Sequence, residues 1–368
     1  MFTILALTAG ARIAGLRGWR LAALAAAIWS ALLAAVIVAP GSALGRLAGM
    51  EARGWAVLGV LGGLAVAYAA AVNWARRRAQ PAPAPQVAPA PTASPDPRAA
   101  APDAPLTDPE LDRYARHIVL REVGGQGQRA LKAANVLVVG AGGLGAPVLQ
   151  YLAAAGVGRI TVADDDVVSL SNLQRQVVFS TADVGRPKVR AAADRLAALD
   201  PHIVVTPLDR RIGKGDADLI AGHDLVLDGT DSFAARAAVN VACVSAGVPL
   251  IAGAIAQWEG QVALYDPLRG GPCMACVFPD APAPGLAPPC AEAGVVGALP
   301  GVVGSIMALE AIKAIAGTVS RGAGEGLRGR MLIFDGLWGE TRRIHIPARP
   351  GCPVCGGMGA AKQEGTAP

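Results

Sequence analysis

The sequence predicts an α/β fold built on a doubly wound, Rossmann-like, mostly parallel sheet, preceded by an all-α transmembrane hairpin. Two observations predict it. A strand, a glycine-rich turn, a helix and a second strand follow one another within residues 136–164, and two long uncharged runs stand near the N-terminus. The length of 368 residues suits about two domains. Hydrophobic residues at 53% and charged residues at 17% exclude a mainly disordered chain.

The net charge of +5 and the pI of about 9.0 do not indicate a nucleic-acid-binding surface. Residues 1–80 contain eight Arg, no Lys and one acid, Glu51. The remaining residues contain 25 Lys and Arg against 27 Asp and Glu. The excess of positive charge therefore belongs to the N-terminal region, and we predict no nucleic-acid partner.

Residues 1–78 are predicted to be a membrane region with two transmembrane helices, at about 21–39 and 55–74. The two runs hold 19 and 20 residues without a charge, the length that spans a hydrocarbon core. A cleaved signal peptide is the alternative for the first run. Arg12, Arg17 and Arg20 precede the first run, and Arg76, Arg77 and Arg78 follow the second. The positive-inside rule therefore places both ends in the cytoplasm.

A Pro/Ala-rich linker is predicted at 79–105, because residues 79–109 hold ten of the 28 prolines. Such a segment is an extended, semi-rigid spacer. A single α/β domain is predicted at 106–357, and a flexible tail at 358–368.

The first chemical signal is the turn G-A-G-G-L-G, which contains Gly140, Gly142 and Gly145. It follows the apolar run Val136–Val139 and opens a helical stretch. Glycines let the backbone approach phosphates, and a helix N-terminus attracts their charge. Asp164, 24 residues after Gly140, is placed to accept ribose hydroxyls. This pattern predicts a nucleotide site without choosing between NAD, FAD and ATP.

The following segment favours a triphosphate. Asn172 and Arg175 lie in the run S-L-S-N-L-Q-R-Q, and Lys188 lies in G-R-P-K. Two cationic side chains suit the oxygens of a triphosphate, whereas the ribose-binding turn of a dehydrogenase has little use for them. The run L-V-L-D-G-T-D then ends in Asp228 and Asp231. Carboxylates at a strand end face the ligand crevice and suit Mg²⁺ beside phosphates. The alternative is that Arg175 and Lys188 are solvated surface charges and that Asp228 is a cap.

Two C-x-x-C pairs predict a structural metal site. The pairs are Cys273 with Cys276 and Cys352 with Cys355. Four thiolates at this spacing suit tetrahedral Zn²⁺, which would tie the C-terminal part to the rest of the domain. Redox pairs and disulfides are the alternatives. Cys290 stands alone after a Pro-rich stretch, where an exposed thiol near a helix start can have a lowered pKa. Cys243 lies in the apolar helix predicted at 234–246 and is interpreted as a packing residue.

These motifs, with Arg113-Tyr-Ala-Arg116-His, resemble the ThiF/MoeB/HesA family, bacterial relatives of the ubiquitin-activating enzymes. The resemblance covers about residues 106–357 and is nearest to the molybdopterin-synthase adenylyltransferase group. It implies an adenylyltransferase that uses ATP and Mg²⁺ on the C-terminal glycine of a small ubiquitin-like sulfur-carrier protein ending in Gly-Gly, of the molybdopterin or thiamine type. Products would be an acyl-adenylate and pyrophosphate.

The resemblance also implies residue roles. The three glycines cradle the nucleotide and Asp164 takes the ribose, while Asn172, Arg175 and Lys188 meet the phosphates. Asp231 holds Mg²⁺ or orients the reacting phosphate. Arg116 reaches the phosphates of the opposite subunit in a homodimer, and Cys290 matches a mobile-loop cysteine that links covalently to the carrier in some members.

The predicted function is therefore carrier adenylation by a catalytic domain on the cytoplasmic side of the inner membrane, with a sulfur donor acting in trans. Three alternatives remain open. They are an NAD- or FAD-dependent oxidoreductase, a relative that adenylates a peptide or a tRNA base, and a binding module without turnover. Arg175, Lys188 and the lack of a recognisable catalytic His or Tyr setting argue against the oxidoreductase.

Overall fold

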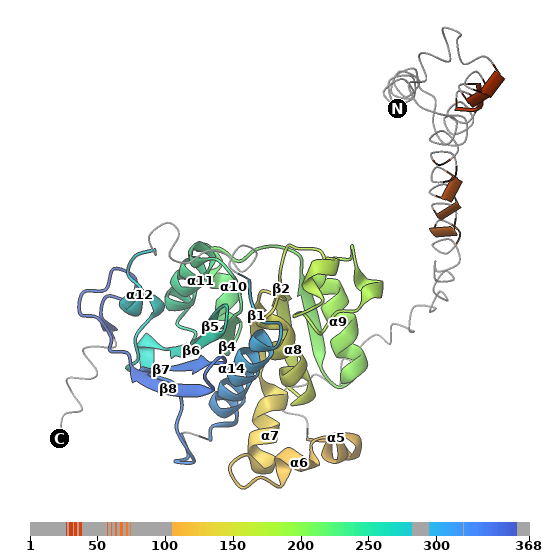
Figure 1. Ribbon diagram of the computed structural model, residues 1–368. Coiled ribbons are helices and arrows are strands. Elements are labelled where there is room, and N and C mark those ends of the chain that lie inside the picture. Colours follow the sequence, from red (N-terminus) through yellow and green to blue (C-terminus); the bar gives the residue numbers. More distant parts are fainter. Residues whose placement is uncertain are drawn as a thin grey trace. The chain divides into compact units, whose positions relative to one another are not determined.

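Figure 1 shows the computed structural model, which describes residues 105–281, 294–318 and 320–358 and scattered positions between 27 and 74. The chain divides into two compact units, residues 1–92 and 93–368. In the first unit, the described positions within 27–38 and 57–74 are α-helical. The predicted hairpin as a whole, most of the linker and the tail after 358 lie outside the described residues and stay predictions.

One eight-stranded sheet forms the centre of the second unit, with strand order β3-β2-β1-β4-β5-β6-β7-β8. The first five strands in this order are parallel, and β5 to β8 pair antiparallel. The predicted mostly parallel, doubly wound sheet is confirmed. The strands are β1 Asn135–Val139, β2 Arg159–Ala163, β3 Val204–Leu208, β4 Leu225–Asp228, β5 Leu250–Ala256, β6 Glu259–Tyr265, β7 Arg330–Asp335 and β8 Glu340–His345.

Helices cover both faces of this sheet (Figure 1). They are α5 Asp108–Arg113, α6 Ala115–Ile118, α7 Gly124–Ala133, α8 Gly145–Ala154, α9 Lys188–Leu199, α10 Ala217–Ala221, α11 Phe233–Ala246, α12 Met274–Val277 and α14 Ala298–Ala316, with 3-10 turns η1 Leu170–Asn172, η2 Thr181–Asp183 and η3 Pro267–Arg269. The ends of α11 follow local rules: the Ser232 hydroxyl accepts the N–H of Ala235, and Gly247 ends the helix in the left-handed conformation.

Alternation along β1 assigns the helices to the two faces. Val136 and Val138 pack into one buried cluster with side chains of α7, α8, α9 and α14. Leu137 and Val139 point the other way, into a second cluster with α10 and α11. Successive side chains of a strand face opposite sides, and a strand covered on both faces is therefore apolar throughout.

Helix α14 is the one helix in the described part of the chain that is long and apolar enough to cross a membrane. It packs instead in the domain core, where Val303, Met307 and Ala311 are fully buried. Its burial in the core explains why the helix is apolar around most of its circumference.

Helices α5 and α6 are fixed to the domain by buried polar contacts. The hydroxyl of Tyr114, between the two helices, donates to Asp200 Oδ2 at 2.6 Å, and Asp200 is fully buried. The ammonium of Lys132 on α7 donates to Glu110 Oε2 at 2.8 Å, with both side chains buried. These contacts give the motif around Tyr114 a structural role.

The adjacent parallel strands β4 and β5 end at different heights. Asp228, the last residue of β4, pairs with Ala252 of β5. Strand β5 continues to Ala256 and pairs there with Glu259 of β6. The β5–β6 hairpin therefore extends past the carboxyl end of β4.

Candidate active site

The glycine turn joins β1 to α8, as predicted, and its geometry requires glycine at two positions. Gly140 has a φ of +88°, which side-chain-bearing residues rarely adopt. A Cβ on Gly145 would lie 1.8 Å from the carbonyl oxygen of Gly140, so any side chain would push the helix away from the strand. Gly142 differs, because its nearest neighbour would be Gln176 Nε2 at 3.6 Å. A Cβ at Gly142 would therefore make an ordinary contact without a clash, and this residue is partly exposed.

Asp164 follows β2 and lies against this turn. Its Oδ2 accepts the N–H of Ala141 at 2.7 Å, and its Oδ1 accepts the N–H of Asp166 at 2.8 Å. Burial raises the pKa of Asp164, while the charge of Lys188 and these N–H donors oppose the rise. The carboxylate is thus fixed beside the glycine turn, where the sequence places a ribose ligand.

Lys188 is the first residue of α9, and its side chain is 6% exposed. The ammonium donates to Asp166 Oδ2 at 2.7 Å. Its backbone N–H also donates to the carbonyl oxygen of Asp166 at 2.9 Å. A buried cation is therefore held beside the loop that carries Asp164.

The segment 169–176 lies across the glycine turn. The carbonyl oxygen of Asn172, in η1, accepts the N–H groups of Arg175 and Gln176 at 3.0 Å each. Arg175 Nη1 donates to the carbonyl oxygen of Ser171 at 3.2 Å, and its Cδ lies 3.7 Å from the place of a Cβ on Gly143. Gln176 is buried, and its Oε1 has no hydrogen-bond partner among the described residues.

The carboxyl end of β4 carries the two predicted acids in different environments. Asp228 is fully buried, its Oδ1 accepts the N–H of Thr230 at 2.9 Å, and its Oδ2 lacks a partner within the described segments. Burial raises the pKa of Asp228. Asp231 is exposed, so its carboxylate is accessible from solvent. Arg236 of α11 donates from Nε and Nη2 to the carbonyl oxygen of Thr230, at 3.0 and 2.8 Å, and fixes this loop.

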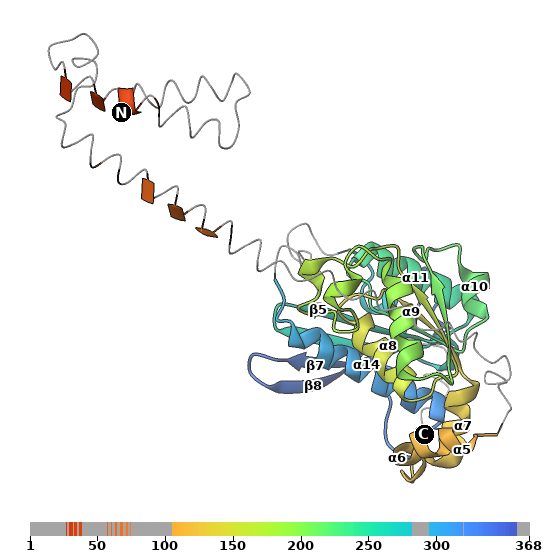
Figure 2. The same cartoon turned by 90° about the vertical axis from the view of Figure 1, so that its right-hand side faces the viewer.

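The structure brings most of the predicted nucleotide residues to one edge of the sheet. The turn after β1, the loop after β2 and the loop after β4 are neighbours there, since these strands are parallel and adjacent. Arg116 is exposed on α6, which lies at the opposite end of the domain from the loop after β2 (Figures 1 and 2). Arg116 therefore does not reach this edge within one chain. Cys290 lies outside the described residues.

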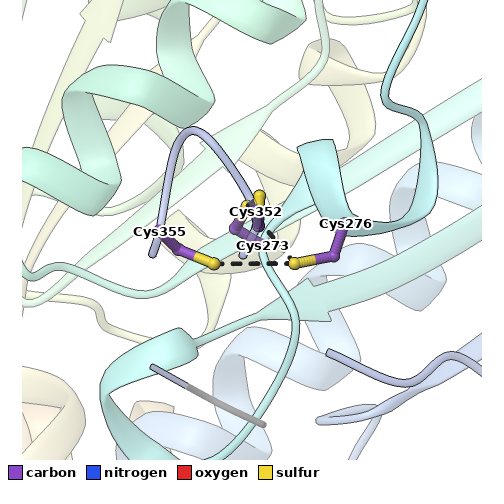
Figure 3. Close-up of side chains that lie close together, drawn as sticks. All are labelled: Cys273, Cys276, Cys352 and Cys355. Atoms are coloured by element: carbon purple, nitrogen blue, oxygen red, sulfur yellow. Dashed lines mark hydrogen bonds between the residues drawn. The ribbon is translucent and has the colours of Figure 1, made fainter. Parts of the chain in front are cut away.

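The four predicted zinc ligands form one cluster (Figure 3). Their sulfur atoms all lie within 4.8 Å of one another, and three Sγ···Sγ distances are 3.8, 3.7 and 3.5 Å. Tetrahedral zinc with Zn–S bonds of ~2.3 Å requires sulfur separations of about 3.8 Å. Burial raises the pKa of Cys273. At Cys352 backbone N–H donors outweigh burial and lower the pKa to about 7. The donor set fits a closed zinc site with four thiolate ligands.

We call the edge formed by the turn after β1 and the loops after β2 and β4 the nucleotide edge. Three residues there were missed by the sequence analysis: Asp166, Gln176 and Arg236. The signal for Asp166 was the run of three aspartates at 164–166, of which only the first was interpreted. These three carboxylates lie close enough to hold an ion. Each carboxylate nevertheless has a partner within the protein. Asp164 accepts backbone N–H groups, Asp166 accepts the Lys188 ammonium, and Asp165 accepts Arg211 Nε through both oxygens, at 2.9 and 2.8 Å.

Comparison with known proteins gives consistent matches. The family model described as ThiF family matches residues 114–354. The sulfur carrier protein adenylyltransferase of Thermus thermophilus is 50% identical over 255 residues, covering 68% of this chain and 92% of the relative. The molybdopterin-synthase adenylyltransferase of Escherichia coli is 45% identical over 254 residues, covering 69% and 99%.

A solved structure supports the fold alone. The crystal structure of E. coli MccB with ATP matches with a TM-score of 0.58 at 24% identity, covering 66% of this chain and 74% of that one. The family model spans most of the described domain, including the glycine turn and three of the four clustered cysteines. The chain therefore belongs to the ThiF family.

Proposed function

We propose that this chain adenylates the C-terminal glycine of a small ubiquitin-like sulfur-carrier protein of the molybdopterin or thiamine type, using ATP. The observation that carries the proposal is the juxtaposition of the glycine turn with the fixed Asp164 carboxylate, the buried Lys188 ammonium and Arg175. The names of the relatives, sulfur carrier protein adenylyltransferase and molybdopterin-synthase adenylyltransferase, supply the substrate class.

The reaction requires charge neutralisation more than proton transfer. The carrier carboxylate is already ionised and attacks the α-phosphorus of ATP, forming the acyl–phosphate bond. The bond between the α-phosphorus and the bridging oxygen breaks, and pyrophosphate leaves with its electron pair. We assign the ribose to Asp164 and the phosphates to the glycine turn, Asn172, Arg175 and Lys188, which hold the reactants in line and neutralise developing charge.

Two metal ions fit the donor sets. The exposed Asp231 would hold Mg²⁺, since this ion keeps several waters and takes one or two carboxylates with the phosphates. When bound, Mg²⁺ supplies neutralisation of phosphate charge. The four clustered cysteines would hold Zn²⁺ in a closed site, where it ties residues 352–355 to α12.

A homodimer would complete the site. Arg116 is exposed at the end of the domain away from the nucleotide edge, so it is available to the site of a second copy. Helices α5 and α6 are anchored by Tyr114 and Glu110, which would give that arginine a fixed position. The sulfur donor is proposed to be a separate protein, and Cys290 to form the covalent link to the carrier.

The test is ATP–pyrophosphate exchange by the full chain in detergent, with a panel of carriers ending in Gly-Gly. We expect carrier-dependent exchange that falls at least about a hundredfold in Arg175→Ala and in Lys188→Met. Arg195→Ala is the matched control, because Arg195 is exposed on the same helix as Lys188. Exchange that survives both site variants would refute the proposed phosphate contacts. Tight binding of a nicotinamide or flavin without exchange would favour the oxidoreductase.

We also propose that the runs 21–39 and 55–74 anchor the protein in the inner membrane, with the catalytic domain in the cytoplasm. Their uncharged length and flanking arginines support this, and the described positions in both runs are helical. A reporter fused after Arg78 should read cytoplasmic. A periplasmic signal at that fusion would overturn the topology.

A further inference from the structure

We propose that Asp166 is a positioning residue that holds the Lys188 ammonium in place for the phosphates of ATP. The inference rests on the proposed adenylation, and it assigns a role to the last carboxylate of the 164–166 run. It arises from contacts across 22 residues of sequence, between the loop after β2 and the start of α9.

Asp166 holds Lys188 at two points. The Asp166 carboxylate accepts a hydrogen bond from the Lys188 ammonium at 2.7 Å, and the Asp166 carbonyl oxygen accepts one from the Lys188 backbone N–H at 2.9 Å. Asp166 is fixed in turn, because its own N–H donates to Asp164 Oδ1 at 2.8 Å. Asp164 is bonded to Ala141 in the glycine turn. A continuous chain of hydrogen bonds therefore connects the glycine turn to the Lys188 ammonium.

The two charges of this pair have different access to solvent. The Lys188 side chain is 6% exposed, whereas the Asp166 side chain is 60% exposed. A buried ammonium without a partner is costly, and a flexible lysine stem has many alternative rotamers. The carboxylate of Asp166 restricts the ammonium to one position. Because its other side faces water, Asp166 can keep its charge hydrated while Lys188 contacts a phosphate.

The neighbouring carboxylate provides an internal contrast. Asp165 also forms an ion pair, but its partner Arg211 is 80% exposed at the side chain. An exposed pair of this kind contributes little to stability or to the position of a buried group. Asp165→Asn is therefore a matched control for Asp166→Asn, since both substitutions replace a carboxylate by an amide in the same loop.

The experiment is ATP–pyrophosphate exchange by the full chain in detergent, with separate determination of kcat and of KM for ATP. We expect Asp166→Asn to lower kcat by about tenfold to a hundredfold and to change KM for ATP by less than about threefold. The reason is that the amide leaves the positive charge in the pocket but no longer aims it. Asp166→Glu, which keeps the charge, should recover most of kcat. Asp165→Asn should match the wild type.

A double-mutant cycle tests whether Asp166 acts through Lys188. In a Lys188→Met background, adding Asp166→Asn should change kcat by less than about twofold, since the group being positioned is gone. Additive losses would overturn the proposal, as would an Asp166→Asn enzyme with normal kcat. A thermal midpoint near that of the wild type excludes misfolding as the cause.

A failure of the proposed adenylation can be distinguished from a failure of the positioning role. If the wild type itself shows no exchange with any carrier, adenylation of carriers fails. The pair is then tested by calorimetric titration of Mg-ATP into the same variants. Asp166→Asn should then change the affinity for Mg-ATP by less than about threefold, as expected for KM, whereas a loss as large as that of Lys188→Met would refute the positioning role.

Discussion

Replacing Glu110 by Gln should destabilise the second unit, because it leaves the Lys132 ammonium buried without a counter-charge. Glu110 Oε2 accepts three hydrogen bonds at 2.8 Å, from the N–H and the hydroxyl of Thr107 and from the ammonium of Lys132. The glutamine oxygen can keep the contacts to Thr107 but cannot neutralise the ammonium. Besides Glu110, the ammonium contacts the carbonyl oxygen of Pro105 at 3.1 Å.

The magnitude follows from burial. The side chains of Glu110 and Lys132 are 3% and 6% exposed, and removing one partner of such a pair costs about 3 kcal/mol. In a domain of this size, that loss lowers the thermal midpoint by about 6–12 °C.

The effect should depend on pH in one direction. Burial raises the pKa of Glu110, but hydrogen bonds from Lys132 and Thr107 outweigh it and hold the pKa below its ordinary value. A carboxyl whose pKa is lower in the folded state stabilises the fold above its unfolded pKa of about 4.3. This contribution is lost as the pH falls through the folded pKa. The difference between wild type and Glu110→Gln should therefore shrink on acidification.

Guanidinium unfolding of residues 93–368 in a series from pH 7 down to about pH 3, which extends below the unfolded pKa, measures both effects. Glu122→Gln is the control, because its pair with Arg121 is exposed and spans 3.4 Å. We expect the control to change the free energy of unfolding by less than about 0.5 kcal/mol. A cost below about 1 kcal/mol for Glu110→Gln, or a difference that grows toward low pH, would contradict the reasoning.

Three further outcomes are expected. Gly145→Ala should weaken Mg-ATP binding about a hundredfold in calorimetry, because the new Cβ would lie 1.8 Å from the Gly140 carbonyl oxygen, and binding within threefold of wild type would contradict this. The purified chain should hold about one zinc, and chelation or Cys352→Ser should lower the thermal midpoint, whereas a metal-free preparation with an unchanged midpoint would rule out the four-thiolate site. Cys290→Ser should keep ATP–pyrophosphate exchange within about twofold of the wild type, because attack by the carrier carboxylate needs no thiol. The same substitution should abolish any covalent adduct with the carrier. A large loss of exchange would instead give Cys290 a role in adenylation.

The features predicted correctly from sequence are those whose chemistry imposes a local spacing. The glycine turn must join a strand to a helix N-terminus, and β1 and α8 are found on either side of it. The C-x-x-C pairs must each place two sulfurs on one ion, and the structure brings both pairs together. The strand β1, apolar on both faces, also carried a clear signal.

Other features depend on partners that are distant in sequence. Asp166 gains its role from Lys188, 22 residues later, and the orphaned Gln176 oxygen is evident only once its burial is known. Strand β8 gave no periodic signal, since all six of its residues are exposed. Arg116 could be assigned to a partner's site only through the family resemblance, because within one chain it is far from the nucleotide edge.

The unequal ends of β4 and β5 give the nucleotide edge a step. Four residues of β5 continue past Ala252, the partner of Asp228, and at ~3.3 Å per residue they extend about 13 Å beyond the end of β4. Three of the four are glycine or alanine, in the order Gly253, Ala254, Ile255 and Ala256. Had all the strands stopped level with Asp228, a ligand would meet a flat rim. The step instead offers a side wall beside the end of β4, longer than two extended glycine residues.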